Sequence, residues 1–75
     1  MDLNEFVKHF AEQFDEIPPE TFKPTTVFKD IEDWSSLTAL SIIAMVDEEM
    51  EQRITGADIR NSNTIEDLFL LIQSK

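Results

Sequence analysis

Apolar side chains recur at helical spacing in three separate stretches of this 75-residue chain, and this recurrence limits the possible fold more than any other feature. The first stretch has one apolar row, made of Leu3, Phe6, Val7, Phe10 and Phe14. Residues three and four apart lie on the same side of a helix, so the row predicts an amphipathic helix with an aromatic stripe. Pro18 and Pro19 are expected to end this helix near Ile17, because proline cannot continue the hydrogen-bond ladder.

A second helix is expected to begin at Ser35 or Ser36, with a serine as N-cap, and to run to about Met50. Its predicted core row consists of Ala39, Ile42, Ile43, Val46 and Met50. The opposite row consists of Leu37, Ser41, Ala44 and Glu48, flanked by Leu40, Asp47 and Glu51. This outer surface is apolar near the helix start and acidic further along, which favours an interaction surface over a purely solvated face.

The C-terminal third is expected to hold two further helices. After a break at Gln52-Arg53-Ile54-Thr55-Gly56, which contains the only glycine, the residues Ala57 to Asn61 predict one short helical turn. Thr64 followed three residues later by Asp67 resembles a capping box. The last helix then keeps helical spacing in Ile65, Leu68, Phe69 and Ile72.

The segment from Pro18 to about Ser35 shows no sustained period and is expected to be a long loop. Three apolar side chains are predicted to fasten this loop to the helices: Phe22, Val27 and Phe28. Trp34 is interpreted as a loop anchor, with contact to a ligand or partner as the alternative. His9 is expected on the solvated side of the first helix.

The predicted fold class is all-α, a small four-helix bundle with three main helices, one short helix and a long first loop. Residues 1–75 are too few for a second core, so the whole chain is expected to be one domain. One glycine, three prolines and no run of alternating β-branched residues favour helices over a sheet.

Charge limits the possible partners. Sixteen acidic and six basic residues give a formal net charge of −10, which disfavours nucleic acid and anionic membranes. No basic residue lies between Lys29 and Arg53, so the negative field is concentrated on the central segment. This pattern favours partners that present a Lys/Arg patch. The absence of cysteine and of an apolar membrane-length run predicts a cytoplasmic protein, and we expect a monomer.

Catalytic and metal chemistry find little support in the sequence. The single histidine lacks a nearby partner for a Ser/His/Asp arrangement, and no Cys/His set suits zinc. Asp30, Glu32 and Asp33 are closely spaced oxygen donors, but the glycine and distal glutamate of a calcium loop are missing. We therefore expect no enzymatic activity and no metal site.

Ser36, followed by Leu37 at the start of the second helix, is the most informative candidate site. A helix N-terminus exposes unpaired N–H groups and carries partial positive charge, so a phosphodiester on Ser36 would be tolerated there. The alternative is that Ser35 and Ser36 are simply caps, which is common before an amphipathic helix.

Four motifs follow one another along the chain: Ser36-Leu37 at a helix start, the run Ile42-Ile43-Ala44-Met45-Val46-Asp47-Glu48-Glu49-Met50, then Ile54, and finally Thr64-Ile65-Glu66-Asp67. With these motifs, nearly the whole chain resembles the acyl carrier protein family. The resemblance implies that Ser36 carries 4'-phosphopantetheine taken from coenzyme A, whose thiol holds acyl groups as thioesters. The expected function is an acyl carrier in fatty-acid or related acyl and polyketide biosynthesis, within lipid metabolism.

The resemblance also implies a set of partners. They are a phosphopantetheinyl transferase and acyl-transferring, condensing or ligase enzymes with basic patches. The expected docking face consists of Leu37, Leu40, Ala44, Asp47, Glu48 and Glu51. Contacts of this kind speed encounter and select partners, and they weaken with salt.

The chain departs from the family pattern immediately before the serine. Ser35 replaces the usual aspartate, and Asp33 stands where a glycine is common. This departure suggests a carrier dedicated to one pathway, and Ser35 is a second possible attachment site. Two other hypotheses stay open, namely an aminoacyl or peptidyl carrier and an unmodified helical interaction module.

Overall fold

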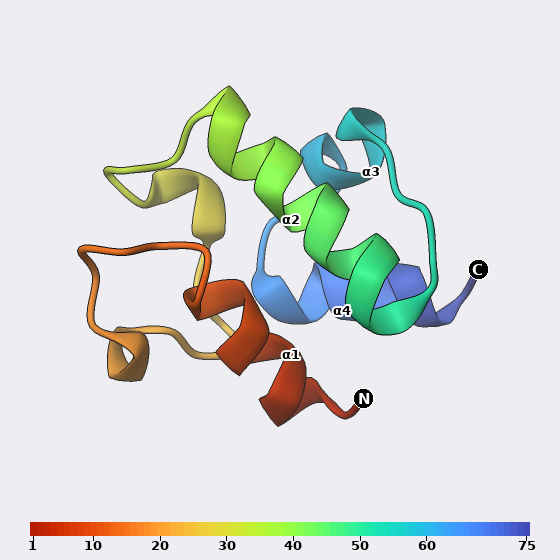
Figure 1. Cartoon of the computed structure of the whole chain (residues 1–75), viewed down its shortest axis with the longest axis horizontal. Coiled ribbons are helices and arrows are strands. Elements are labelled where there is room, and N and C mark those ends of the chain that lie inside the picture. Colours follow the sequence, from red (N-terminus) through yellow and green to blue (C-terminus); the bar gives the residue numbers. More distant parts are fainter.

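Four α-helices, with no β-strand, make up the computed structural model, which describes residues 1–75 (Figure 1). Their bounds are α1 Leu3–Ala11, α2 Ser36–Met50, α3 Gly56–Arg60 and α4 Ile65–Gln73. Two single 3₁₀ turns, Pro19–Thr21 and Phe28–Asp30, interrupt the long connection between α1 and α2. The fold is a small all-α bundle, as the sequence predicts. None of the helices is both long and apolar enough to cross a membrane.

Each helix is preceded by an N-cap residue whose side chain accepts a hydrogen bond from a backbone N–H of the first turn. The four N-caps are Asp2, Ser35, Thr55 and Thr64. These caps satisfy N–H groups that have no partner within the helix. The caps of α3 and α4 are capping boxes with Asp58 and Asp67, which confirms the predicted box at Thr64. In these boxes the backbone N–H groups of Thr55 and Thr64 donate to the two carboxylates and lower the pKa of each aspartate below its usual value.

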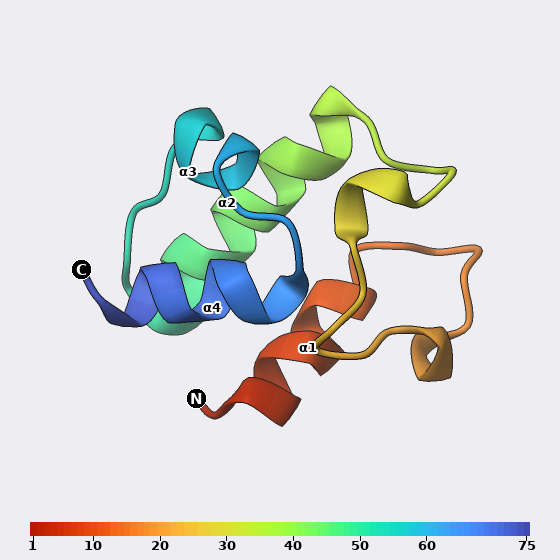
Figure 2. The same cartoon turned by 180° about the vertical axis from the view of Figure 1, so that it is seen from behind.

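The helices enclose one core. α1 packs against α4 and α2, and α3 packs against α2 and α4. In Figure 1 α2 lies in front, and in Figure 2, seen from behind, α4 lies in front, so the two helices form opposite sides of the bundle. Sixteen buried apolar residues form the core, and all six phenylalanines are among them, as predicted.

Phe10 is the centre of an aromatic cluster that joins α1 to the long loop. Its ring centroid lies 6.2 Å from that of Phe6, 5.5 Å from that of Phe28 and 6.4 Å from that of Trp34. Phe14 stacks at 5.9 Å from Phe10. The cluster crosses from α1 to Trp34, two residues before the start of α2, and it confirms the interpretation of Trp34 as an anchor.

Backbone hydrogen bonds also fasten the loop to α4. The N–H groups of Ile65 and Glu66 donate to the carbonyls of Thr26 and Pro24, at 3.2 and 3.0 Å. Val27 forms an isolated antiparallel bridge with Thr64 at the same place. The loop thus satisfies two of the N–H groups that α4 leaves unpaired at its start.

Two predictions for α1 and the loop are wrong. α1 ends at Ala11 rather than near Ile17, because the chain tightens there into bonds that span three residues, Gln13 to Phe10 and Phe14 to Ala11. This tighter turn keeps Phe14 on the core side, so the apolar row continues to Phe14 after α1 has ended. Val27 does not pack into the core; its side chain is 41% exposed, and its backbone makes the contact instead.

The core row of α2 is partly as predicted. Ile42 and Val46 are fully buried, while the other three predicted members, Ala39, Ile43 and Met50, are half-buried against the core. Met45 is buried although the sequence did not place it in the row. α2 contacts α1 on one side and α3 on the other, so the buried stripe is wider than a single row.

Phe10→Ala is expected to lower the free energy of unfolding by about 3–5 kcal/mol, because it removes a fully buried ring and leaves a cavity among five other rings. Urea unfolding followed by circular dichroism measures this change. Leu70→Ala, at a side chain that is 58% exposed, is the control and should change stability by less than about 0.5 kcal/mol. An equal loss of unfolding free energy in the two variants would show that the aromatic cluster contributes no more to stability than an exposed leucine does.

Candidate functional site

The two serines at the start of α2 have different roles. Ser35 is the N-cap, and its hydroxyl accepts a hydrogen bond from the backbone N–H of Thr38 at 3.3 Å and lies 3.2 Å from the Thr38 hydroxyl. Ser36 is the first residue of the helix, is exposed, and its hydroxyl takes no part in the cap. The capping interpretation therefore holds for Ser35 and not for Ser36.

The backbone before Ser36 is held in place from two directions. The indole of Trp34 lies parallel to the ring of Phe10, with 1° between their planes, and its centroid is 5.0 Å from that of Phe28. The Thr38 hydroxyl donates to the carbonyl of Asp33 at 3.3 Å. Ser36 is thus an exposed hydroxyl on a fixed support.

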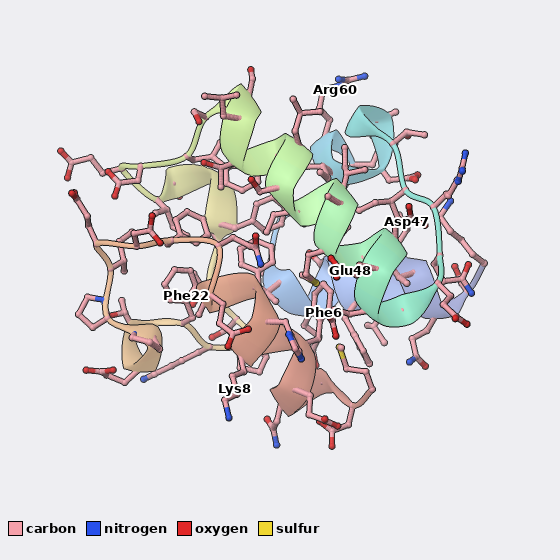
Figure 3. All side chains as sticks on the ribbon, viewed as in Figure 1. Phe6, Lys8, Phe22, Asp47, Glu48 and Arg60 are labelled. Carbon is pink, nitrogen blue, oxygen red and sulfur yellow. The ribbon has the colours of Figure 1, made fainter.

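The predicted docking residues all lie on the surface. Leu37 and Leu40 are 75% and 61% exposed, which forms an apolar patch next to Ser36. Ala44, Asp47, Glu48 and Glu51 are exposed as well. Helical spacing aligns this set along α2, and Figure 3 shows Asp47 and Glu48 on the second half of the helix.

The acidic end of α2 opposes what helix stability favours. A helix C-terminus carries partial negative charge and is stabilised by cations. The last turn of α2 has no basic residue and instead contains Asp47, Glu48 and Glu49. Each such carboxylate costs a few tenths of a kcal/mol to about 1 kcal/mol at low salt. The cluster is therefore not explained by the stability of its own helix.

Glu51 ends α2 in a left-handed conformation, with φ 55° and ψ 35°. It is the only residue of the protein with a positive φ, and glycine is the usual residue for this position because it has no Cβ to clash. A side chain there costs about 1 kcal/mol relative to glycine. The Glu51 carboxylate is thus kept on the surface at the expense of a more favourable helix end.

Two hollows lie along α2, one against α3 and the other against the segment that precedes α3. The first, about 410 Å³, lies beside the attachment candidate and is lined by Trp34, Ser35, Ser36, Ala39, Gly56, Ile59 and Arg60. The second, about 420 Å³, lies further along and is lined by Leu40, Ile43, Ala44, Asp47, Arg53, Ile54 and Thr55. Each has an apolar wall and one arginine, which is Arg60 at the end of α3 in the first and Arg53 before the start of α3 in the second.

Sequence reasoning missed the contribution of α3 to the site. Arg60 and Ile59 reach the surroundings of Ser36 through the packing of α3 against α2. The residues are far apart in the sequence, and no spacing rule connects an arginine at the end of a short helix to a serine at the start of another. Only the tertiary contact reveals it.

Comparisons with models of protein families, with curated proteins and with solved structures find no match.

Ser35→Ala is expected to destabilise the protein by about 1 kcal/mol, since it removes the cap of α2. Ser36→Ala should change stability by less than about 0.3 kcal/mol, because alanine suits the first helical turn and no hydrogen bond of the cap is lost. The two substitutions are chemically identical and adjacent, so each is the control of the other in urea unfolding. The opposite order of stabilities would assign the cap to Ser36.

Proposed function

We propose that this protein is an acyl carrier protein that holds acyl intermediates as thioesters on a 4'-phosphopantetheine arm attached to Ser36. The observation that carries the proposal is the separation of roles between the two serines. Ser35 makes the cap, so the exposed Ser36 hydroxyl is free for modification on a rigid helix start. The resemblance to the acyl carrier protein family supplies the chemical identity of the arm.

Attachment is a group transfer between coenzyme A and the Ser36 hydroxyl, carried out by a separate transferase. The hydroxyl oxygen bonds to the phosphorus of the phosphopantetheine portion, and the pyrophosphate bond of coenzyme A breaks. Adenosine bisphosphate leaves, and the hydroxyl proton passes to a base of the transferase or to water. The product is a phosphodiester whose far end is a thiol, the only thiol of a protein that lacks cysteine.

The position of Ser36 suits a phosphodiester. As the first residue of a helix of 15 residues, it lies beside backbone N–H groups that have no partner inside the helix. The helix dipole adds partial positive charge at this end. Both effects offset the charge of an attached phosphate without requiring a change of fold.

The surface of α2 supports docking to basic enzymes. The apolar patch of Leu37 and Leu40 lies next to the attachment point, and Asp47, Glu48 and Glu51 follow along the helix. The acidic end and the left-handed Glu51 both cost stability, so their retention favours a role in recognition. The proposed partners are a phosphopantetheinyl transferase and the acyl-transferring, condensing or ligase enzymes that act on the cargo.

The proposed setting is cytoplasmic acyl metabolism, in fatty-acid synthesis or a related acyl or polyketide pathway, with the protein acting as a monomer. Ser35 in place of the usual aspartate favours a dedicated carrier. Ser35 has a neutral hydroxyl, which is engaged in the cap of α2. The usual motif of the acyl carrier protein family has the carboxylate of an aspartate at this position.

Incubation with coenzyme A and a broad-specificity phosphopantetheinyl transferase is expected to add one phosphopantetheine, measured by intact mass spectrometry. Ser36→Ala should abolish the mass gain completely, because it removes the accepting oxygen. Ser35→Ala is the matched control and should still be loaded.

Three other outcomes would each change the conclusion. A gain lost in Ser35→Ala and kept in Ser36→Ala would move the attachment to Ser35. A gain kept in both variants would point to a site elsewhere. No gain with several transferases would contradict the carrier function and favour an unmodified interaction module.

Removing the three acidic docking charges together, by Asp47→Asn, Glu48→Gln and Glu51→Gln, is expected to slow loading. The second-order rate constant should fall about tenfold at low salt, because steering toward a basic transferase is lost. The difference should nearly disappear near 1 M salt, where the screening length is about 3 Å.

A control variant removes the same charge from the long loop instead, by Asp15→Asn, Glu16→Gln and Glu20→Gln. Its rate constant should stay within about twofold of the unmodified sequence. Equal slowing in the two triple variants would show that net charge, and not the face of α2, governs encounter.

A further inference from the structure

The hollow beside Ser36 differs in charge from the rest of the surface. Five hollows are found on the protein, and three of them contain carboxylates. A fourth, under the long loop, has no charged residue. The hollow at Ser36 alone has a cation, Arg60, and no carboxylate. In a protein of net charge −10, a hollow lined by a cation and by no carboxylate is an exception among the five.

Arg60 is held close to the backbone of α3. Its guanidinium nitrogen Nη1 would lie 3.3 Å from a Cβ placed on Gly56, so the side chain lies back along the helix over the only glycine of the protein. The carbonyl of Arg60 accepts a hydrogen bond of 2.6 Å from Nζ of Lys29. Figure 3 shows the Arg60 side chain at the end of the molecule where α2 begins.

Arg60 has no anionic partner within the protein. The two close contacts between opposite charges are His9 with Glu12 and Lys75 with Asp58. Asp58, the acidic residue of α3, is already engaged by Lys75 and by the backbone N–H of Thr55. Although acidic residues outnumber basic ones by sixteen to six, the guanidinium of Arg60 forms no ion pair with any of them. It can therefore pair with an anion that the unmodified chain does not contain.

We infer that Arg60 binds the phosphate that Ser36 carries, and that it thereby holds the first segment of the attached arm in the hollow between α2 and α3. The inference rests on the proposed function for the identity of the phosphate. An arginine suits this role because its planar guanidinium offers several N–H donors to phosphate oxygens at once. Arg53 lies on the second hollow, where Asp47 also lines the wall, so it does not share this role.

The two arginines make a direct test possible, since the protein contains only these two. The full chain is prepared with phosphoserine at position 36, whose phosphate stands in for that of the arm and needs no transferase. In ¹⁵N-labelled protein the Nε–Hε signal of Arg60 should shift, and its proton exchange should slow about two- to fivefold, the range for an exposed ion pair. The Arg53 signal is the internal control and should stay unchanged.

Substitutions of the two arginines test the same contact through the ³¹P signal of the phosphate. The ³¹P signal of phosphoserine should change in Arg60→Gln and be unaffected in Arg53→Gln, which removes the same charge from the other hollow. Arg60→Lys keeps the charge but loses the planar donor set, so its ³¹P signal should lie between those of the unmodified sequence and Arg60→Gln.

An unchanged Arg60 signal on phosphorylation, or equal shifts of both arginines, would overturn the inference, because only a contact distinguishes the two cations. Loading by coenzyme A is a separate experiment. A protein that is loaded on Ser36 but shows no Arg60 contact keeps the carrier function and loses this inference. A protein that shows the contact with phosphoserine but is never loaded keeps the phosphate site and loses the carrier function.

Discussion

The aromatic cluster around Phe10 is the contact on which the rest of the structure depends. A bundle of four short helices with a long first loop has few ways to order that loop, because loops bury little apolar surface of their own. Here rings from α1 and from the loop meet at Phe10, and the cluster ends at Trp34, two residues before α2. The same contacts that complete the core therefore fix the backbone that presents Ser36.

The start of α2 shows how one helix end can serve stability and chemistry at once. A cap needs a side-chain oxygen whose lone pairs point at the first turn, whereas an attachment site needs an oxygen free in solvent. One residue cannot do both well. Ser35 takes the first task and leaves the Ser36 hydroxyl in solvent, so the proposed modification of Ser36 need not disturb the helix.

The helices, two of their four caps and most of the core follow from local signals in the sequence. Spacing identifies α2, α3 and α4, and Thr64 with Asp67 marks the start of α4. The end of α1 escaped prediction because a tighter turn keeps Phe14 in phase after the helix has ended. Val27 and Arg60 escaped for a different reason, since the backbone bridge of Val27 and the position of Arg60 beside Ser36 both arise from packing between distant segments.

The charges along α2 differ between its two ends. At its start the hollow contains Arg60 and no carboxylate, which favours an anion held by the protein itself. At its end, carboxylates accumulate where the helix dipole disfavours them and where Glu51 adopts a conformation suited to glycine. Neither arrangement is explained by the stability of the bundle. Each is explained if one end of α2 holds a phosphate and the other meets basic partners, because a partner drawn to the acidic end then approaches along the helix that carries the cargo.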